Sequence, residues 1–483
     1  MRGLAEELSK LGVENVVAAP VAGSPDPGFG IQGFVKPQMS NGIKVWRFGC
    51  RESGGDLGEI YGQGDPVAAE GFKKVLDAER PDIVHFHAWS PAVSILLVRE
   101  VKRRGLRMVQ TYHTPTLSCP RGTLMRWGKI VCDGDLARRP CALCAIHGKL
   151  RKGYRRWDMG YGKDSGSGIP DTGCRIQGES QHRNSPNPEA RIPNPNIQGI
   201  RMLVSKLTTM FRMPGLIRKR TEAVREMFRE VDAMVALNEW SRKLLILNGV
   251  EESKIRLIRH GVREEQAIDN RAEGRGAGSE MLKLVFLGRV APEKGIDVLL
   301  RALSLVKTKV ELDIYGIGSD WPPKTFPRPS DLVAPRIGGN PLTRGDSGYG
   351  GRDTGGEKEP SIRNPESRIR WLAPVKPEQV VETIRKYDAL VVPSVWLETG
   401  PLVVLEAFAA GVPVIGSRLG GIAEMVRDGE DGLLFEAGCP SKLASAIQIF
   451  ERVQPILRSN VGEPKTSGEV ASQHLKLYKE LLP

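Results

Sequence analysis

The sequence predicts an α/β protein with parallel sheets, organised as two domains joined by a linker. Short apolar runs alternate with stretches of helical length, which is the order expected when helices connect parallel strands. This series occurs twice, and the polar stretch 263–280 separates the two occurrences. A chain of 483 residues is long enough for such an arrangement, because domains average roughly 150 residues.

The first series is expected within a domain at residues 1–262. Its predicted strands and helices are Asn15–Ala19, Ala68–Glu79, Ile83–Phe86, Ala92–Arg104, Met108–Tyr112 and Ala233–Ala236. The second series is expected within 281–450, and a final helix at 465–483 is expected to pack back on the first domain. Its predicted elements are Leu282–Phe286, Gly295–Val306, Val310–Tyr315, Pro377–Tyr387, Ala389–Val392, Pro401–Ala410 and Val412–Ile415.

Two segments, 163–200 and 321–369, do not fit either series. Both are rich in Gly and Pro and show neither helical nor strand periodicity. Such compositions cannot bury enough apolar surface to fold, so we predict two disordered insertions, one in each domain.

Charge and composition limit the classes of function. The net charge is +13, and Arg99–Arg156 alone holds 15 Lys or Arg against 3 Asp or Glu. Such a segment suits nucleic acid, an anionic membrane surface or a phosphorylated ligand. No apolar run approaches the ~18 residues of a membrane span, and Met1–Lys10 is too charged for a secretory signal. Seven cysteines are few, which favours a reducing, cytoplasmic compartment.

The strongest functional signal is Glu398–Gly411, ETGPLVVLEAFAAG. Gly400 and Pro401 favour a tight turn into a helix, whose first backbone N–H groups, at Leu402 and Val403, would form an anion site.

Two carboxylates flank that helix start. Glu398 and Glu406 could line one side of a pocket at the carboxyl end of a strand, where α/β sheets place ligands. From spacing alone, two surface glutamates are an equally good interpretation.

A second signal is Gly288–Gly295, GRVAPEKG, which follows a strand and opens a helix. It brings Arg289 and Lys294 to a strand end, where two fixed cations can neutralise a leaving diphosphate. The alternative is a pair of solvated loop cations. The Gly420–Gly421 turn is a third, weaker signal, because glycine turns mostly serve backbone geometry.

Together these pieces resemble the retaining glycosyltransferases of family 4, which have the GT-B fold of two Rossmann-like domains facing across a cleft. The matching residues, from Leu282 to Phe435 outside the insertion, include FLGRVAPEKGIDVLLRAL and PSVWLETGPLVVLEAFAAGVPVIGSRLGGIAEMVRDGEDGLLF. The resemblance implies that Arg289 and Lys294 contact the donor's phosphates and that Glu398 approaches the donor sugar. It also implies donor-binding roles for Gly288, Gly400, Leu402, Val403 and, at the ribose, Glu406.

The first domain carries a further match and a departure. In Thr111–Thr114, TYHT, His113 matches a histidine that this family places beside the donor sugar; a histidine that caps the turn is the alternative. His85 and His87, in the run VHFH, are expected to face opposite sides of a strand, so at most one would reach a cleft, and both are expected to be structural. Met1 falls inside what corresponds to the family's first helix, so the first strand and its Gly-rich loop are expected to be missing, which puts activity in question.

Four cysteines form a separate group: Cys119, Cys132, Cys141 and Cys144, with the spacing C-x12-C-x8-C-x2-C. Four thiolates can hold one tetrahedral zinc ion, so we predict a structural zinc site. Four unrelated core cysteines and an iron–sulfur cluster are the alternatives. A divalent cation on the DGD run at Asp133–Asp135 is disfavoured, because that run lies between Cys132 and Cys141 in a basic segment.

The sequence therefore predicts a hexosyltransferase-type enzyme of cell-envelope polysaccharide synthesis. It would move a sugar from a nucleotide-sugar to a hydroxyl of a glycan or lipid-linked acceptor, with retention of configuration and no catalytic cofactor. The expected location is the cytoplasm, with peripheral contact to the anionic inner face of the membrane. The alternatives are a non-catalytic relic of the fold, or a basic protein that binds anionic surfaces or nucleic acid. A nucleic-acid partner is not expected, because Arg99–Arg156 lacks interleaved aromatic residues.

Overall fold

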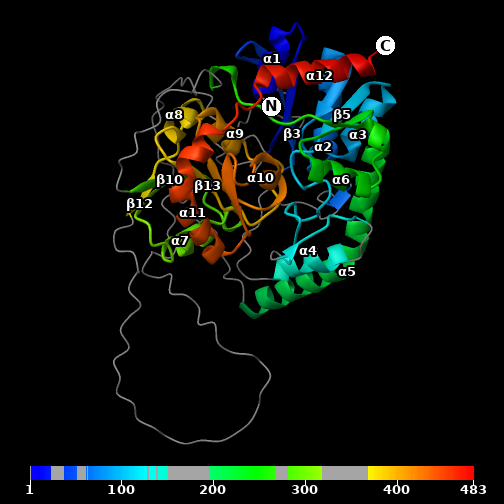
Figure 1. Cartoon of the computed structure of the whole chain (residues 1–483). Coiled ribbons are helices and arrows are strands. Elements are labelled where there is room, and N and C mark those ends of the chain that lie inside the picture. Colours follow the sequence, from blue (N-terminus) through cyan, green and yellow to red (C-terminus); the bar gives the residue numbers. More distant parts are fainter. Residues whose placement is uncertain are drawn as a thin grey trace, which may run out of the picture. The chain divides into compact units, whose positions relative to one another are not determined.

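A six-stranded parallel sheet organises the C-terminal half of the chain, with the strand order β12-β11-β10-β13-β14-β15 (Figure 1). Its strands are β10 (Leu282–Arg289), β11 (Val310–Ile317), β12 (Arg368–Leu372), β13 (Ala389–Val392), β14 (Val414–Ser417) and β15 (Gly432–Phe435). From the β10–β13 pair, the sheet continues through β11 and β12 on one side and through β14 and β15 on the other. Parallel sheets bind ligands at the carboxyl ends of such a switch point, so the topology itself marks where a site is expected.

The computed structural model describes residues 2–22, 37–51, 61–62, 64–127, 130–136, 140–150, 195–266, 281–317 and 368–482. Among these residues, no helix is both long and apolar enough to cross a membrane.

Helices cover both faces of the six-stranded sheet. α7 (Ile296–Leu303) and α11 (Pro440–Ser459) share one core with alternate strand residues such as Leu284 and Phe286. α8 (Val380–Ile384), α9 (Leu402–Ala409) and α10 (Gly420–Met425) share the other core with the intervening residues, such as Val285. This alternation follows from the two-residue period of a strand. Because both faces are buried, β13 is a continuous apolar run, ALVV.

Two smaller sheets belong to the N-terminal half. One has the order β1-β3-β2, with β1 (Val16–Ala22), β2 (Gln38–Ser40) and β3 (Ile43–Cys50). The other has the order β4-β5-β8-β9, with β4 (Ile83–Phe86), β5 (Arg107–Thr111), β8 (Ala233–Ala236) and β9 (Ile255–Leu257). α2 (Pro66–Glu79) packs on β3, where a Cβ at Gly71 would lie 2.8 Å from the Cβ of Phe48.

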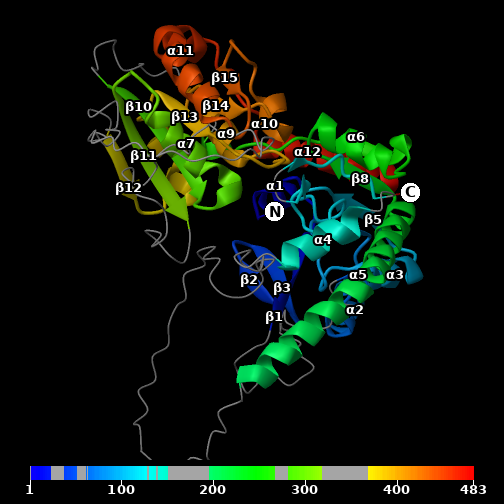
Figure 2. The ribbon, with the colours of Figure 1, turned by 90° about the horizontal axis from the view of Figure 1, so that it is seen from below.

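The remaining elements frame these sheets. The helices are α1 (Arg2–Lys10), α3 (Ile95–Arg103), α4 (Pro140–Leu150), α5 (Pro195–Glu230), α6 (Glu239–Leu247) and α12 (Ser467–Leu481), and β6 (Met125–Arg126) pairs with β7 (Ile130–Val131) in an antiparallel ribbon. Short 3-10 turns occur at Glu252–Lys254, Glu264–Gln266, Pro292–Lys294 and Pro377–Gln379. The long helix α5 contacts both α3 and α4 (Figure 2).

The chain forms two units. The first comprises Met1–Val13, Ala236–Lys243 and Arg256–Glu480, and the second comprises Glu14–Val235, Leu244–Ile255 and Leu481–Pro483. The domain bounds at 262 and 281, and the packing of a C-terminal helix on the first domain, stay predictions.

The predicted α/β class with parallel sheets is confirmed, and three strands, β4, β8 and β13, have the predicted bounds. The predicted bounds of both insertions were wrong at the C-terminal end, where the structure has a helix and a strand. Residues 195–200 are the first turns of α5, because Pro195 suits a helix start, and β12 begins at Arg368. The rest of both insertions and residues 267–280 of the linker lie outside the described residues.

A buried ion pair ties the edge strand β12 to its neighbour. Asp313 on β11 is 1% exposed, and its register partner Arg370 donates hydrogen bonds from Nε and Nη2, each 2.7 Å long. The hydroxyl of Tyr387 donates to the same carboxylate. Burial alone would raise the pKa of Asp313, but these hydrogen bonds hold it below its usual value. The pair therefore stabilises the folded chain above the carboxylate's unfolded pKa, and the contribution is lost as the pH falls through the folded pKa.

We expect Asp313→Asn to lower the free energy of unfolding by about 2–3 kcal/mol at neutral pH, because it removes the charge that Arg370 and Tyr387 satisfy. Urea denaturation measures the change. The matched control is Glu382→Gln, at an exposed carboxylate in an i,i+3 pair, which should cost no more than about 0.5 kcal/mol. Equal losses in the two variants would contradict this role for Asp313.

Candidate functional site

A buried ion pair lies just beyond the carboxyl ends of β10 and β13. The Nζ of Lys294 is 2.7 Å from Oε1 of Glu398, and the hydroxyl of Ser394 donates to the same oxygen at 2.6 Å. Glu398 is 8% exposed. A carboxylate this buried needs a counter-charge, and Lys294 supplies it. The structure thus brings together two of the predicted catalytic residues.

A glycine lets the Lys294 loop approach β13. The loop forms the 3-10 turn Pro292–Lys294, which ends at Gly295 with φ +68°. A Cβ at Gly295 would lie 1.8 Å from the carbonyl oxygen of Pro393, so no other residue fits. The backbone N–H of Val395 also donates to the carbonyl of Glu293 at 2.9 Å. These contacts fix Lys294 against the loop that carries Glu398.

The Gly420–Gly421 turn holds the other side of that loop. The N–H of Gly421 donates to the carbonyl of Glu398 at 2.7 Å, and a Cβ at Gly421 would lie 2.8 Å from the same oxygen. The side-chain amide of Asn238 donates to the carbonyl of Thr399 at 2.6 Å. The turn that was weak as a sequence signal is therefore part of the site. Asn238 was missed, because no motif links it to Glu398.

β10 ends in a cationic side chain, and α9 begins shortly after Glu398. Gly288, at the end of β10, has φ +153°. The Arg289 side chain that follows is 54% exposed, and its guanidinium lies 3.9 Å from the carboxylate of Glu293. α9 begins at Leu402, after Gly400 (φ +140°), with no side-chain cap on its first N–H groups, at Leu402 and Val403. This arrangement can attract an anion at the switch point.

Glu406 lies within α9, and its carboxyl is largely shielded from water. Burial raises the pKa of Glu406 to about 7, and the charge of Arg263 offsets only part of the effect. The group therefore exists in both protonation states near neutral pH, so it can both donate and accept hydrogen bonds at a sugar hydroxyl.

Three histidines cluster at the ends of β4 and β5, in the second unit. His87 Nδ1 lies 2.8 Å from His113 Nε2, and the rings of His85 and His87 have centroids 4.0 Å apart. His85 Nε2 also lies 2.7 Å from the hydroxyl of Thr111. The prediction that His85 and His87 face opposite sides was wrong, because residues two apart in a strand point to the same face. His87 also contacts His113 directly.

The four predicted zinc ligands, Cys119, Cys132, Cys141 and Cys144, line one cavity of the second unit. Within the described residues, however, no three His, Cys, Asp or Glu side chains already stand in an arrangement that could hold a metal ion. The zinc site thus stays a prediction.

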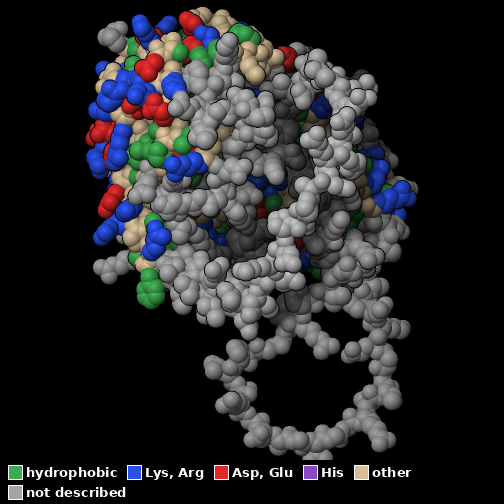
Figure 3. Space-filling model, turned by 180° about the vertical axis from the view of Figure 1, so that it is seen from behind, with side chains coloured by type: hydrophobic (Ala, Val, Ile, Leu, Met, Phe, Trp, Pro, Cys, Tyr) green, Lys and Arg blue, Asp and Glu red, His purple; other side chains and the backbone are tan. Residues whose placement is uncertain are grey.

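The basic segment is partly neutralised by acidic neighbours. Figure 3 shows Asp and Glu side chains among the Lys and Arg side chains of the described surface. The ion pairs at the start of the segment are Arg99–Glu226, Lys102–Glu230, Arg103–Glu100, Arg104–Asp77 and Arg107–Asp232. This surface is therefore of mixed sign, which disfavours a continuous nucleic-acid footprint there.

Two family models match the chain. The model of "Glycosyl transferases group 1" matches residues 269–465, which include every predicted donor-site residue of the first unit. The model of "Glycosyl transferase 4-like domain" matches residues 1–163, which include His113 and the four cysteines. Together they cover most of the chain in the predicted order.

Curated relatives are similar over part of their length. The D-inositol 3-phosphate glycosyltransferase of Streptomyces avermitilis is 31% identical over 219 residues, 44% of this chain and 42% of the relative. The enzyme of the same name from Streptomyces scabiei is 28% identical over 261 residues, 52% of each chain. The chain thus spans about half the length of these relatives.

Solved structures extend the similarity to nearly the whole chain. Sucrose-phosphate synthase from Thermosynechococcus elongatus has a TM-score of 0.56 and 16% identity, covering 99% of this chain and 92% of that one. A glycosyltransferase from Rickettsia africae has a TM-score of 0.55 and 14% identity, covering 100% and 93%. Anabaena HepE in complex with UDP has a TM-score of 0.51 and 13% identity, covering 97% and 100%. At these identities the likeness shows the fold alone, and it confirms the predicted GT-B class.

The buried carboxyl of Glu406 gives a prediction about stability. Because its folded-state pKa of about 7 lies above the ordinary value of 4.5, the folded chain holds this proton to higher pH than the unfolded chain does. The contribution of Glu406 to the free energy of unfolding therefore falls as the pH rises through that interval. We expect Glu406→Gln to lose this part of the pH dependence of the unfolding free energy, measured by urea denaturation between the two pKa values, 4.5 and about 7. Glu378→Gln, at an exposed carboxylate, should keep the wild-type slope. Parallel profiles for all three proteins would contradict the burial of Glu406.

Proposed function

We propose that the chain is a glycosyltransferase that combines a group 1 domain with a 4-like domain, and that it transfers a hexose from a nucleotide-sugar to an acceptor hydroxyl with retention of configuration. The observation that carries the proposal is the Lys294–Glu398 pair at the switch point, between the end of β10 and the start of α9. A cation, a buried carboxylate and free helix N–H groups are the partners that a sugar diphosphate needs there.

The proposed reaction uses the leaving group as its own base. The bond between the anomeric carbon and the phosphate oxygen breaks, and the acceptor oxygen forms its bond on the same face. The acceptor's proton passes to the departing phosphate oxygen. Lys294, Arg289 and the first N–H groups of α9 stabilise the negative charge that develops on the diphosphate. Glu398 orients Lys294 and can accept hydrogen bonds from the donor sugar, while Glu406 contacts the ribose.

His113 is proposed to hydrogen-bond the donor sugar. Only one proton fits between His87 Nδ1 and His113 Nε2, so one ring donates and the other accepts. This hydrogen bond fixes the plane of the His113 ring and its tautomer. His87 is thus a positioning residue, which acts on the sugar through His113.

The donor and acceptor are proposed by class. Since Anabaena HepE was solved with UDP, uridine diphosphate sugars are the first donors to test. Since the curated relatives are D-inositol 3-phosphate glycosyltransferases, an inositol phosphate is the first acceptor to test, beside a lipid-linked glycan. We place the reaction in the cytoplasm at the inner face of the membrane, in the synthesis of a cell-envelope glycan, where the basic residues of Arg99–Arg156 would contact anionic lipid.

The deciding experiment incubates the purified full chain with radiolabelled UDP-glucose, UDP-N-acetylglucosamine or GDP-mannose and each acceptor. Formation of a labelled product whose anomeric configuration, read by NMR, equals that of the donor would support the proposal. An inverted product would refute retention. Binding of nucleotide-sugar in calorimetry without turnover of any donor would favour a non-catalytic relic of the fold.

Lys294→Ala should lower the transfer rate by about 10²–10³, because one charge-assisted contact to the developing phosphate charge is lost. The rate is measured with the donor that the wild-type chain accepts. Lys307→Ala removes an exposed lysine from the same unit and should keep full activity. A Lys294→Ala rate within twofold of wild type would refute the mechanism.

His87→Phe should lower kcat by roughly 10-fold or more, because His113 loses the partner that fixes its ring. KM for the donor should change less than kcat. His87→Asn can place an amide where Nδ1 was, and should restore most of the rate. If both variants lose activity equally, or if neither loses any, His87 does not position His113.

A further inference from the structure

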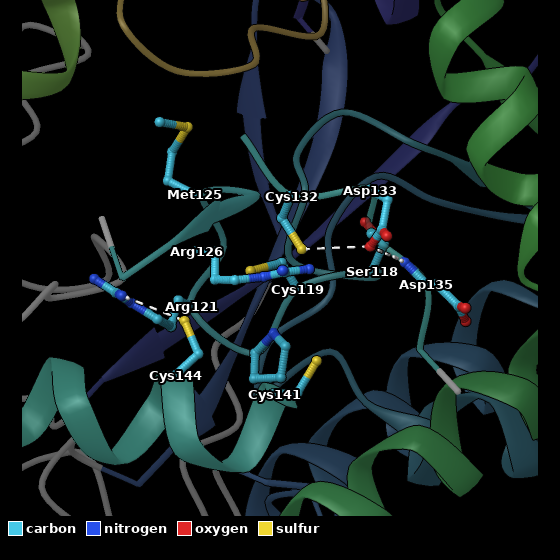
Figure 4. A pocket seen from close by; sticks show the side chains of 12 residues that line it. Ser118, Cys119, Arg121, Met125, Arg126, Cys132, Asp133, Asp135, Cys141 and Cys144 are labelled. Carbon is cyan, nitrogen blue, oxygen red and sulfur yellow. Dashed lines mark hydrogen bonds between the residues drawn. The ribbon is translucent and has the colours of Figure 1, made fainter. Parts of the chain in front are cut away.

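Four thiol groups border one small cavity of the second unit (Figure 4). Its volume is about 30 Å³, which suits a single ion or one to two water molecules and excludes a nucleotide. Cys119, Cys132, Cys141 and Cys144 line it together with the cationic side chains of Arg121 and Arg126. The proposed sugar transfer uses none of these residues.

Three separate elements bring the sulfur atoms to this cavity. Cys119 lies in a turn, where its N–H donates to the carbonyl of Pro115 at 2.7 Å. Cys132 follows β7, and its N–H closes the β6–β7 ribbon onto the carbonyl of Leu124 at 2.7 Å. Cys141 and Cys144 lie three residues apart on α4 and so share one face of the helix. A ligand bound by all four sulfur atoms would therefore connect the turn at Cys119, the β6–β7 ribbon and α4.

The sulfur of Cys144 already accepts hydrogen bonds. The backbone N–H of Trp127 donates to it at 3.4 Å, and Nη1 of Arg121 donates at 3.5 Å. A neutral thiol is a weak acceptor, whereas a thiolate is a strong one. Trp127 also adopts φ +59°, an unfavourable conformation for a non-glycine residue, and this conformation accompanies its N–H donation to the sulfur.

A buried cation lies near two of the four cysteines. Arg220 on α5 is 5% exposed and donates to the carbonyls of Thr116 and Leu117. Among the residues that the structure describes, no carboxylate forms an ion pair with it. Cys119 and Cys141 are close enough to interact electrostatically with its guanidinium. A buried charge without a counter-charge is costly, so a negative group at the cysteines would stabilise Arg220.

A soft divalent cation would make this group of cysteines anionic, because it displaces the protons of the thiols that bind it and holds them as thiolates.

We propose that Cys119, Cys132, Cys141 and Cys144 bind one zinc ion as a tetrathiolate, whose charge is balanced by Arg220 and Arg121. Zinc displaces four thiol protons, and the resulting Zn(Cys)4 centre is a dianion that faces two guanidinium groups. Zn–S bonds of ~2.3 Å require sulfur–sulfur separations of ~3.5–4 Å. Since no such cluster stands ready among the described side chains, binding must draw the sulfurs together and tighten the turn, the ribbon and α4. The proposal does not depend on sugar transfer.

The test uses the purified, reduced full chain. Elemental analysis should find about one equivalent of zinc, and Co²⁺ added to chelated protein should give the intense visible bands of a tetrahedral thiolate site. Each Cys→Ser change at the four positions should weaken zinc binding at least 10-fold in a chelator competition. The matched controls, Cys50→Ser and Cys439→Ser, alter half-buried cysteines elsewhere and should bind zinc as wild type. His147→Ala should also keep the ion.

Arg220→Met tests the charge balance separately from the ligands. It should weaken zinc binding by about 10-fold, and Arg220→Lys should recover part of the loss. Absence of zinc together with absence of cobalt thiolate bands in the wild-type chain would overturn the proposal without any variant. An iron–sulfur absorption spectrum, or equal loss of metal in the Cys50 and Cys439 controls, would also overturn it.

Discussion

The buried carboxylate of Glu398 is the constraint on which the proposed donor site depends. A carboxylate that is 8% exposed must find a cation, and Lys294 provides it from a loop 104 residues earlier in the chain. The Lys294 loop can approach β13 because Gly295 has no side chain to clash with the carbonyl oxygen of Pro393. The Glu398 loop can likewise approach Gly421, because Gly421 has no side chain to clash with the carbonyl oxygen of Glu398. The geometry at the switch point thus depends on the two glycines, on the Lys294–Glu398 ion pair and on the strand order.

Much of this arrangement can be predicted from the sequence, because its elements are locally encoded. The runs IVHF, AMVA and ALVV were predicted as strands with the observed bounds, since strands of a parallel sheet are short and largely apolar. Lys294, Glu398 and the start of α9 were found by motif. The helix expected at Pro377–Tyr387 was less regular than predicted, because Pro377 begins a 3-10 turn and α8 covers only Val380–Ile384.

The contacts that assemble the site could not be predicted from local patterns. Asn238 holds the Thr399 carbonyl across 161 residues of sequence, and Arg220 reaches the carbonyls near Cys119 from 103 residues away. No periodicity or motif encodes such pairs, because they depend on which loops the topology brings together. The high pKa of Glu406 was equally unpredictable, since it follows from how deeply the carboxyl is buried.

The backbone hydrogen bonds of the Lys294 and Glu398 loops have a consequence for ligand affinity. Val395 is tied to Glu293, and Gly421 to Glu398, so the two loops are preorganised by their own main chain. Association normally loses free energy when loops and side chains become ordered, at about 0.5–1.5 kcal/mol for each mobile side chain. A site whose charges already stand in place avoids most of that loss. Selectivity among donors must then come from shape and hydrogen bonding at the sugar and base, and not from how readily each donor closes the loops.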